Sequence, residues 1–132
     1  MKKVEDIYFY DGSFDGLMTV IYYCLVNKII PLNILIRKEL NLDLFSNYRD
    51  FETDFSKASS LIKNISKKIS KLSLYITYNV YLSNNEEKEM IILYYLVNGF
   101  KYGTKINNLV KLNCVIKARK ISRYVRNEAH KL

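Results

Sequence analysis

The chain has 132 residues, 49% of them hydrophobic, and its 21 Lys and Arg against 13 Asp and Glu give a net charge of +8. This composition excludes a disordered chain, and the length predicts one domain over residues 1–132 with a sizeable core. Acids at positions 5 and 6 do not fit a signal peptide, and the longest apolar run, residues 17–26, is too short to span a bilayer, so we expect a soluble, cytoplasmic protein that does not contact membranes.

The first elements are a strand and a helix joined by a tight turn. Ile7–Tyr10 predicts a short buried strand that ends at the turn Asp11-Gly12. Ser13 is a typical N-cap, and the apolar spacing that follows predicts a helix to about Lys28. A phosphate could bind at such a helix start, but the two aspartates beside it would repel an anion, so we interpret the motif as turn and cap.

Pro31 interrupts the pattern, and residues 32–36 fit either a second short strand or a loop. Residues 45–51 are moderately typical of a strand, so we expect a small sheet built from Ile7–Tyr10 and Tyr48–Phe51. Asp50, Glu52 and Asp54 alternate there and could hold a divalent metal for nuclease chemistry. Because no histidine joins them and Asp54 can cap the next helix, a solvated strand face is the better interpretation.

Three helices are predicted in the middle of the chain. The first covers Ser56–Ser70, and the second covers Lys71–Leu82 with Leu74, Tyr75, Tyr78, Tyr81 and Leu82 facing the core. A very apolar third helix opens at the glutamates of residues 86–89, runs through Phe100 and is expected to be central. Together with a further helix at the end of the chain, these elements predict an α+β fold, with about five helices and a small sheet of short strands.

The net charge is concentrated at the end of the chain. Residues 101–132 carry nine Lys and Arg against one acid, whereas residues 1–100 carry twelve of each sign. A basic helix at about residues 109–132 would place Cys114, Ala118, Ile121, Val125, Ala129 and Leu132 in one buried stripe. Arg119, Arg123, Arg126 and His130 would then lie on the opposite side, flanked by Lys120 and Lys131.

This basic helix has two interpretations. A solvated face would simply keep the protein soluble, whereas a single-sign stripe of guanidinium groups suits phosphate or carboxylate oxygens. Tyr102 and Tyr124 adjoin the basic region, where a ring could stack on a base. The expected nucleic-acid-binding residues are Arg119, Lys120, Arg123, Tyr124, Arg126, His130 and Lys131.

No catalytic constellation is evident in the sequence. His130 is the only histidine, and Cys24 and Cys114 are expected to be buried free thiols, because neither lies in a metal-binding spacing. We therefore expect binding rather than catalysis, with no metal and no cofactor.

Several segments, in order, resemble a bacterial family. They are the stretch from Tyr10 to Leu17, Glu52-Thr53-Asp54 followed by Lys57-Ala58, the stretch from Leu96 to Gly103, and the ending from Arg126 to Lys131. This family is a domain of unknown function labelled a probable DNA metabolism protein. Its members occur beside a radical-SAM protein described as a putative DNA modification or repair protein, and some are fused to a uracil-DNA-glycosylase-like domain. Members continue past the Glu-Ala-His segment, so this chain resembles a C-terminally shortened member.

The hypothesis that follows is a non-enzymatic nucleic-acid-binding or accessory protein in DNA metabolism or repair, with its basic helix on the phosphates of DNA. The alternative is an adaptor or inhibitor, of a kind that a mobile element could encode, whose arginines dock on an acidic protein such as the radical-SAM partner. A metal-dependent nuclease is a third hypothesis, and the weakest.

Overall fold

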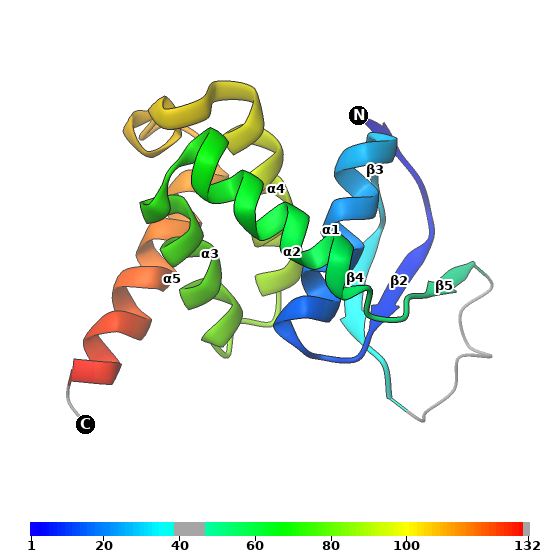
Figure 1. Ribbon diagram of the computed structural model, residues 1–132. Helices are drawn as coiled ribbons and strands as arrows, with labels where there is room; N and C mark the ends of the chain where they lie inside the picture. The colour runs from blue at the N-terminus through cyan, green and yellow to red at the C-terminus, as the bar shows by residue number, and fades with distance from the viewer. Residues whose placement is uncertain (39–46, 131–132) are drawn as a thin grey trace. The chain divides into compact units, whose positions relative to one another are not determined.

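The structure is a computed structural model that describes residues 1–38 and 47–130. The chain divides into two compact units, Met1–Leu61 and Ile62–Leu132. Strands lie in the first unit, and the second is built from helices (Figure 1). The predicted class, mostly helical α+β, is confirmed, and the described part of the chain contains five α-helices. The single domain expected over residues 1–132 stays a prediction.

A three-stranded parallel sheet with the order β4–β2–β5 organises the first unit. β2 (Ile7–Tyr10) pairs with β4 (Asn33–Ile36) on one side and with β5 (Tyr48–Asp50) on the other. All four residues of β2 are buried, as is usual for the centre of a parallel sheet. The predicted sheet is therefore confirmed, and residues 33–36 supply its third strand. Residues 45 and 46 of the expected strand lie outside the described residues.

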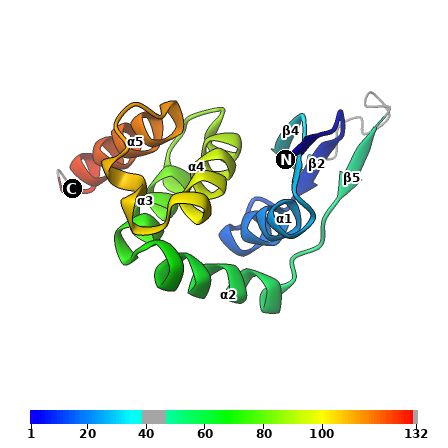
Figure 2. The same ribbon diagram turned by 90° about the horizontal axis from the view of Figure 1, so that it is seen from above.

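α1 (Phe14–Asn27) follows β2 directly and packs against one face of the sheet (Figure 2). The hydroxyl oxygen of Ser13 accepts a hydrogen bond from the N–H of Gly16 at 2.9 Å, which confirms the predicted N-cap. The helix ends at Lys28, whose φ of 55° is left-handed and whose N–H donates to the carbonyl of Cys24. After α1, β3 (Ile29–Ile30) pairs with β1 (Lys2–Lys3) in a separate parallel ladder.

α2 (Phe55–Asn64) and the π-helix η2 (Ile65–Ile69) together occupy the segment predicted as one helix over residues 56–70. α3 (Lys71–Leu82) starts at its N-cap Ser70, whose hydroxyl accepts from the N–H of Ser73 at 2.9 Å. α4 (Lys88–Tyr102), the 3₁₀-helix η3 (Gly103–Asn108) and α5 (Asn113–His130) complete the chain.

α4 is the central helix of the second unit, as predicted. It packs against η2, α3, η3 and α5, and its Leu93, Tyr95 and Leu96 are fully buried. Gly99 lets η2 approach α4 closely, because a Cβ there would lie 2.7 Å from Cδ1 of Ile69.

The predicted core face of α3 is wrong. The residues that α3 buries are Ser73, Ile76, Thr77, Asn79 and Val80. Tyr75, Tyr78 and Leu82 are exposed instead, and Leu74 and Tyr81 are half-buried. Periodicity assigned the large aromatic side chains to the interior, whereas the packed face is made of small polar and β-branched residues that let α3 approach its neighbours.

We predict that Asp11 stabilises the turn between β2 and α1 in a pH-dependent way. Its carboxylate accepts hydrogen bonds from the N–H and hydroxyl of Ser13, at 2.9 and 2.6 Å, and from the hydroxyl of Thr53 at 3.0 Å. These bonds, that from the Ser13 hydroxyl above all, hold the pKa of Asp11 below its ordinary value of 3.8. Asp11→Ala should lower the free energy of unfolding by about 1 kcal/mol near neutral pH.

Because the pKa of Asp11 is depressed in the folded state, this contribution is complete above about pH 4 and is lost as the pH falls through the folded pKa. Unfolding of the wild type and of Asp11→Ala, followed by circular dichroism across an acid pH series, measures the difference. A difference that grows towards low pH would contradict the prediction.

Candidate functional site

α5 packs against α3 and α4 through Val115, Ala118 and Ser122. Ser122 belongs to this face because its hydroxyl accepts a hydrogen bond from the buried amide of Asn79 at 3.1 Å. The predicted buried stripe is therefore wrong in its orientation. Of its members only Ala118 is buried, while Cys114, Ile121 and Val125 are half-buried, Ala129 is exposed and Leu132 lies outside the described residues.

Three arginines of α5 lie beside the packed face rather than opposite it. Arg119, Arg123 and Arg126, here named the arginine face, line a pocket of about 90 Å³ with Ser122. The other wall of this pocket comes from α3 and consists of Leu72, Tyr75 and Ile76. Because Ser122 belongs to the packed face of α5, this face lies closer to the arginines than the predicted stripe does. The arginine face therefore adjoins α3.

Arg119 differs from the other two arginines because part of its side chain is committed to the fold. It is half-buried, and its Nη1 donates a hydrogen bond of 2.6 Å to the main-chain carbonyl of Asn107. Arg123 and Arg126 are exposed. Thus Arg119 anchors the arginine face, and the guanidinium groups of Arg123 and Arg126 are available to a ligand.

The carbonyl that receives Arg119 belongs to a buried polar cluster. The amide oxygen of Asn107 accepts from the hydroxyl of Tyr95 at 2.6 Å, and its amide nitrogen donates to the hydroxyl of Ser73 at 3.2 Å. Burial raises the pKa of Tyr95, so its hydroxyl stays protonated and can donate. The cluster joins α3, α4 and η3, and through Arg119 it also holds α5.

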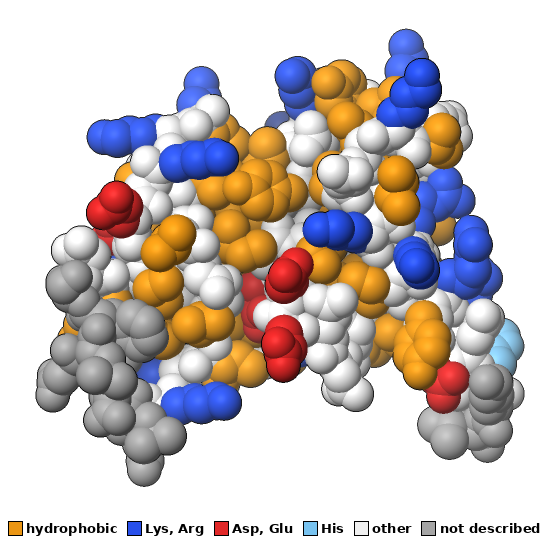
Figure 3. Space-filling view, turned by 180° about the vertical axis from the view of Figure 1, so that it is seen from behind, with side chains coloured by type: hydrophobic (Ala, Val, Ile, Leu, Met, Phe, Trp, Pro, Cys, Tyr) orange, Lys and Arg blue, Asp and Glu red, His pale blue; other side chains and the backbone are white. Residues whose placement is uncertain are grey.

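Charge is segregated between the two units. The sequence of the second unit contains fourteen Lys and Arg against four acids, a net charge of +10, whereas the first unit has seven against nine, a net charge of −2. Within the described residues, no carboxylate forms an ion pair with Arg119, Arg123 or Arg126. Lys and Arg side chains gather over the second unit on the side that carries the histidine (Figure 3).

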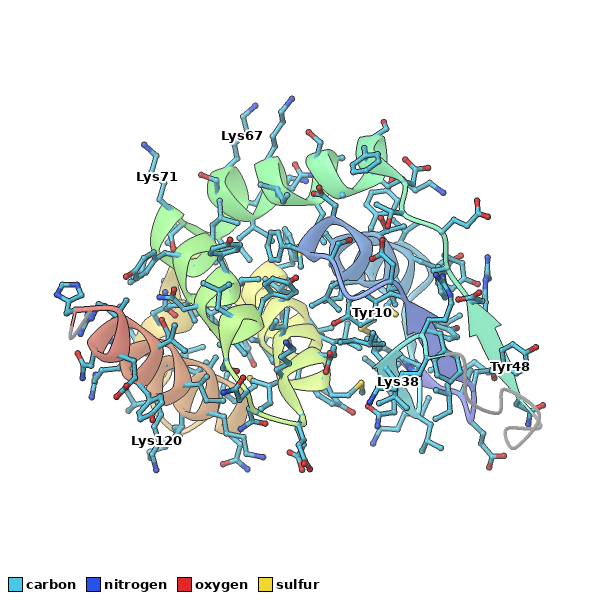
Figure 4. The ribbon with its side chains drawn as sticks, turned by 90° about the horizontal axis from the view of Figure 1, so that it is seen from below. Tyr10, Lys38, Tyr48, Lys67, Lys71 and Lys120 are labelled. Carbon is cyan, nitrogen blue, oxygen red and sulfur yellow. The ribbon has the colours of Figure 1, made fainter. Side chains whose placement is uncertain are left out.

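The other expected site residues extend around α5. Lys120 is exposed and projects outward from the helix, and Lys67 and Lys71 project outward near the start of α3 (Figure 4). Tyr124 is 66% exposed, but at about 100° per residue it lies on a different side of α5 from Arg119 and Arg126. His130 is exposed at the last residue of the helix, and Lys131 lies outside the described residues.

Tyr75 was not among the expected site residues, because the hydrophobic periodicity of residues 71–82 predicts it on the core face. It lines the pocket beside the arginine face and is 46% exposed. No local signal connects residue 75 to residues 119–126, because they are more than forty positions apart in the chain. Only the packing of α3 on α5 brings them together.

Two of the three alternating acids of the first unit, Asp50 and Asp54, have structural partners, and Glu52 is exposed. Asp50 forms an ion pair with Arg37, with 2.6 Å between Oδ1 and Nε, and Asp54 accepts from the N–H of Lys57 at 3.1 Å near the start of α2. No group of three or more His, Cys, Asp and Glu side chains could hold a metal ion in the part of the chain that the structure describes. The interpretation of the turn at residues 10–16 as turn and cap is confirmed by the bonds to Asp11 and Ser13.

A larger pocket, of about 530 Å³, lies beside β5 in the same unit. Arg49 lines this pocket, and its guanidinium carbon lies 4.3 Å from the ring centre of Tyr23 and 4.8 Å from that of Phe51. Because Arg49 stacks on these rings and carboxylates line the same wall, this pocket is less suited to an anion than the arginine face.

Both cysteines are free, Cys24 buried and Cys114 half-buried. Burial raises the pKa of Cys24 to about 12 and also raises the pKa of Cys114. The expectation of buried thiols is confirmed for Cys24 and holds only in part for Cys114. Neither thiol is activated as a nucleophile.

No protein-family model, curated protein or solved structure matches the chain. Membership of the DNA-metabolism family therefore stays a prediction. Among the helices that the structure describes, none combines the length and the apolar character needed to cross a membrane.

We predict that Arg119 contributes to stability and that its two neighbours do not. Arg119→Gln should lower the free energy of unfolding by about 1.5–3 kcal/mol, because a charged donor to a buried carbonyl is lost. Arg123→Gln removes the same charge from an exposed position and should change it by less than about 0.5 kcal/mol. Urea unfolding followed by the helical circular dichroism signal measures both variants, and equal losses would contradict this assignment.

Proposed function

We propose that the second unit binds nucleic acid through the arginine face. The protein would thereby act as a non-enzymatic nucleic-acid-binding or accessory protein in DNA metabolism. The observation that carries the proposal is that Arg123 and Arg126 lie on one helix face with no carboxylate partner among the described residues. Guanidinium groups so placed suit the oxygens of backbone phosphates, which they can bond in pairs.

Two further features support a polyanion as the ligand. The net charge of +10 on the second unit disfavours cations and concentrates phosphates near its surface. Arg119 is held by the carbonyl of Asn107, so the helix that carries the other two arginines is fixed before a ligand arrives.

Contacts of this kind position a nucleic acid without reading its sequence. The resemblance noted in the sequence favours DNA over RNA as the physiological ligand. Lys120, beside the arginine face, would add to the attraction for phosphates.

We predict that the double variant Arg123→Gln, Arg126→Gln binds short duplex and single-stranded DNA more weakly than the wild type. Because each phosphate contact releases counterions, the slope of log affinity against log salt should fall in magnitude by about two. Fluorescence anisotropy of labelled oligonucleotides across a salt series gives both quantities.

The matched control is Lys2→Gln, Lys3→Gln, which removes the same charge from exposed residues of the first unit. Its slope should equal that of the wild type. If both double variants weaken binding equally, net charge rather than the arginine face is responsible. If DNA does not bind even at low salt, while the protein co-purifies with an acidic protein through Arg123 and Arg126, the adaptor hypothesis replaces this one.

A further inference from the structure

The pocket beside the arginine face has an apolar, partly aromatic wall. Leu72 and Tyr75 of α3 border it and are 50% and 46% exposed. Such side chains do not contribute to binding a phosphate alone, since an anion is bound by hydrogen-bond donors and positive charge. The wall therefore indicates that the ligand presents an apolar surface next to its charge.

The ring of Tyr75 is available for a ligand. The neighbouring tyrosines Tyr78 and Tyr81 contact each other, with ring centres 6.0 Å apart. In contrast, no ring or hydrogen-bond partner of Tyr75 occurs among the described residues. Ile76, which follows it, is buried and fixes the position of this part of α3.

The size of the pocket determines how a ligand can use it. At about 90 Å³ it is far smaller than the cavities that enclose a nucleotide-sized molecule. A planar group would consequently lie against the tyrosine ring at the surface, with its charged part turned towards Arg123 and Arg126.

We propose that this pocket is a stacking site for a base of single-stranded nucleic acid. Tyr75 is the platform, and Arg123 and Arg126 bond the flanking phosphates. This inference rests on the proposed function and adds a preference to it. The face of a base is accessible in a single strand but is covered by its neighbours in a duplex, so the site favours single strands.

The test compares the affinity of labelled oligothymidylate with that of a duplex of the same length. Tyr75→Ala should weaken single-strand binding about 5- to 150-fold. Its salt slope should stay at the wild-type value, because no phosphate contact is removed. Tyr75→Phe keeps the ring and should bind as the wild type does, and duplex binding should be the same in all three proteins.

Tyr124→Ala tests the competing platform that the sequence predicts, since it removes an exposed ring of the same size from a different side of α5. It should leave single-strand binding unchanged. Photocrosslinking of a bromouracil-substituted single strand to the wild type, followed by mass spectrometry, should place the crosslink on α3 at Tyr75. Equal thermal unfolding midpoints for the wild type and Tyr75→Ala confirm that the variant is folded.

The outcomes separate the two proposals. If Tyr75→Ala has no effect while Arg123→Gln weakens binding to both forms of DNA, the stacking site is wrong and the proposed function stands. If Tyr124→Ala weakens single-strand binding more than Tyr75→Ala does, Tyr124 is the platform and the inference is overturned. If neither form of DNA binds, both proposals fail.

Discussion

The hydrogen bond from Arg119 to the carbonyl of Asn107 is the interaction on which the rest of the second unit depends. Asn107 is itself held by Tyr95 and Ser73 inside the helical core. Buried polar groups are costly unless every one has a partner, so this cluster admits few alternative arrangements of α3, α4 and α5. It therefore fixes the rotation of α5 and, with it, the side on which Arg123 and Arg126 are presented.

The two units use their arginines in different ways. In the first unit Arg37 pairs with Asp50, and Arg49 stacks on Tyr23 and Phe51. In the second unit, Arg123 and Arg126 have neither an ion pair nor a stacking partner within the described residues. Cations left near each other in this way repel and lower stability slightly, a cost that a polyanionic ligand would relieve.

Local structure followed closely from local chemistry. The strand Ile7–Tyr10, the N-cap at Ser13 and the helix over Lys71–Leu82 all appear where the sequence predicts them, because turn residues and caps act on their own neighbours. Side-chain orientation was predicted less well. On α3 the exposed tyrosines were assigned to the core, since hydrophobic periodicity cannot distinguish an aromatic ring that packs from one that stays at the surface.

By itself, the sequence determined the fold class, the approximate positions of most elements and the concentration of positive charge in residues 101–132. Only the tertiary structure decided that Arg119 supports the fold and that Tyr75 lies beside Arg123 and Arg126. The physical reason is that Ser122 is buried through a hydrogen bond to Asn79, forty-three residues away. This hydrogen bond places the Ser122 side of α5 against α3. The pattern of residues within α5 alone cannot predict it, because its donor lies on another helix.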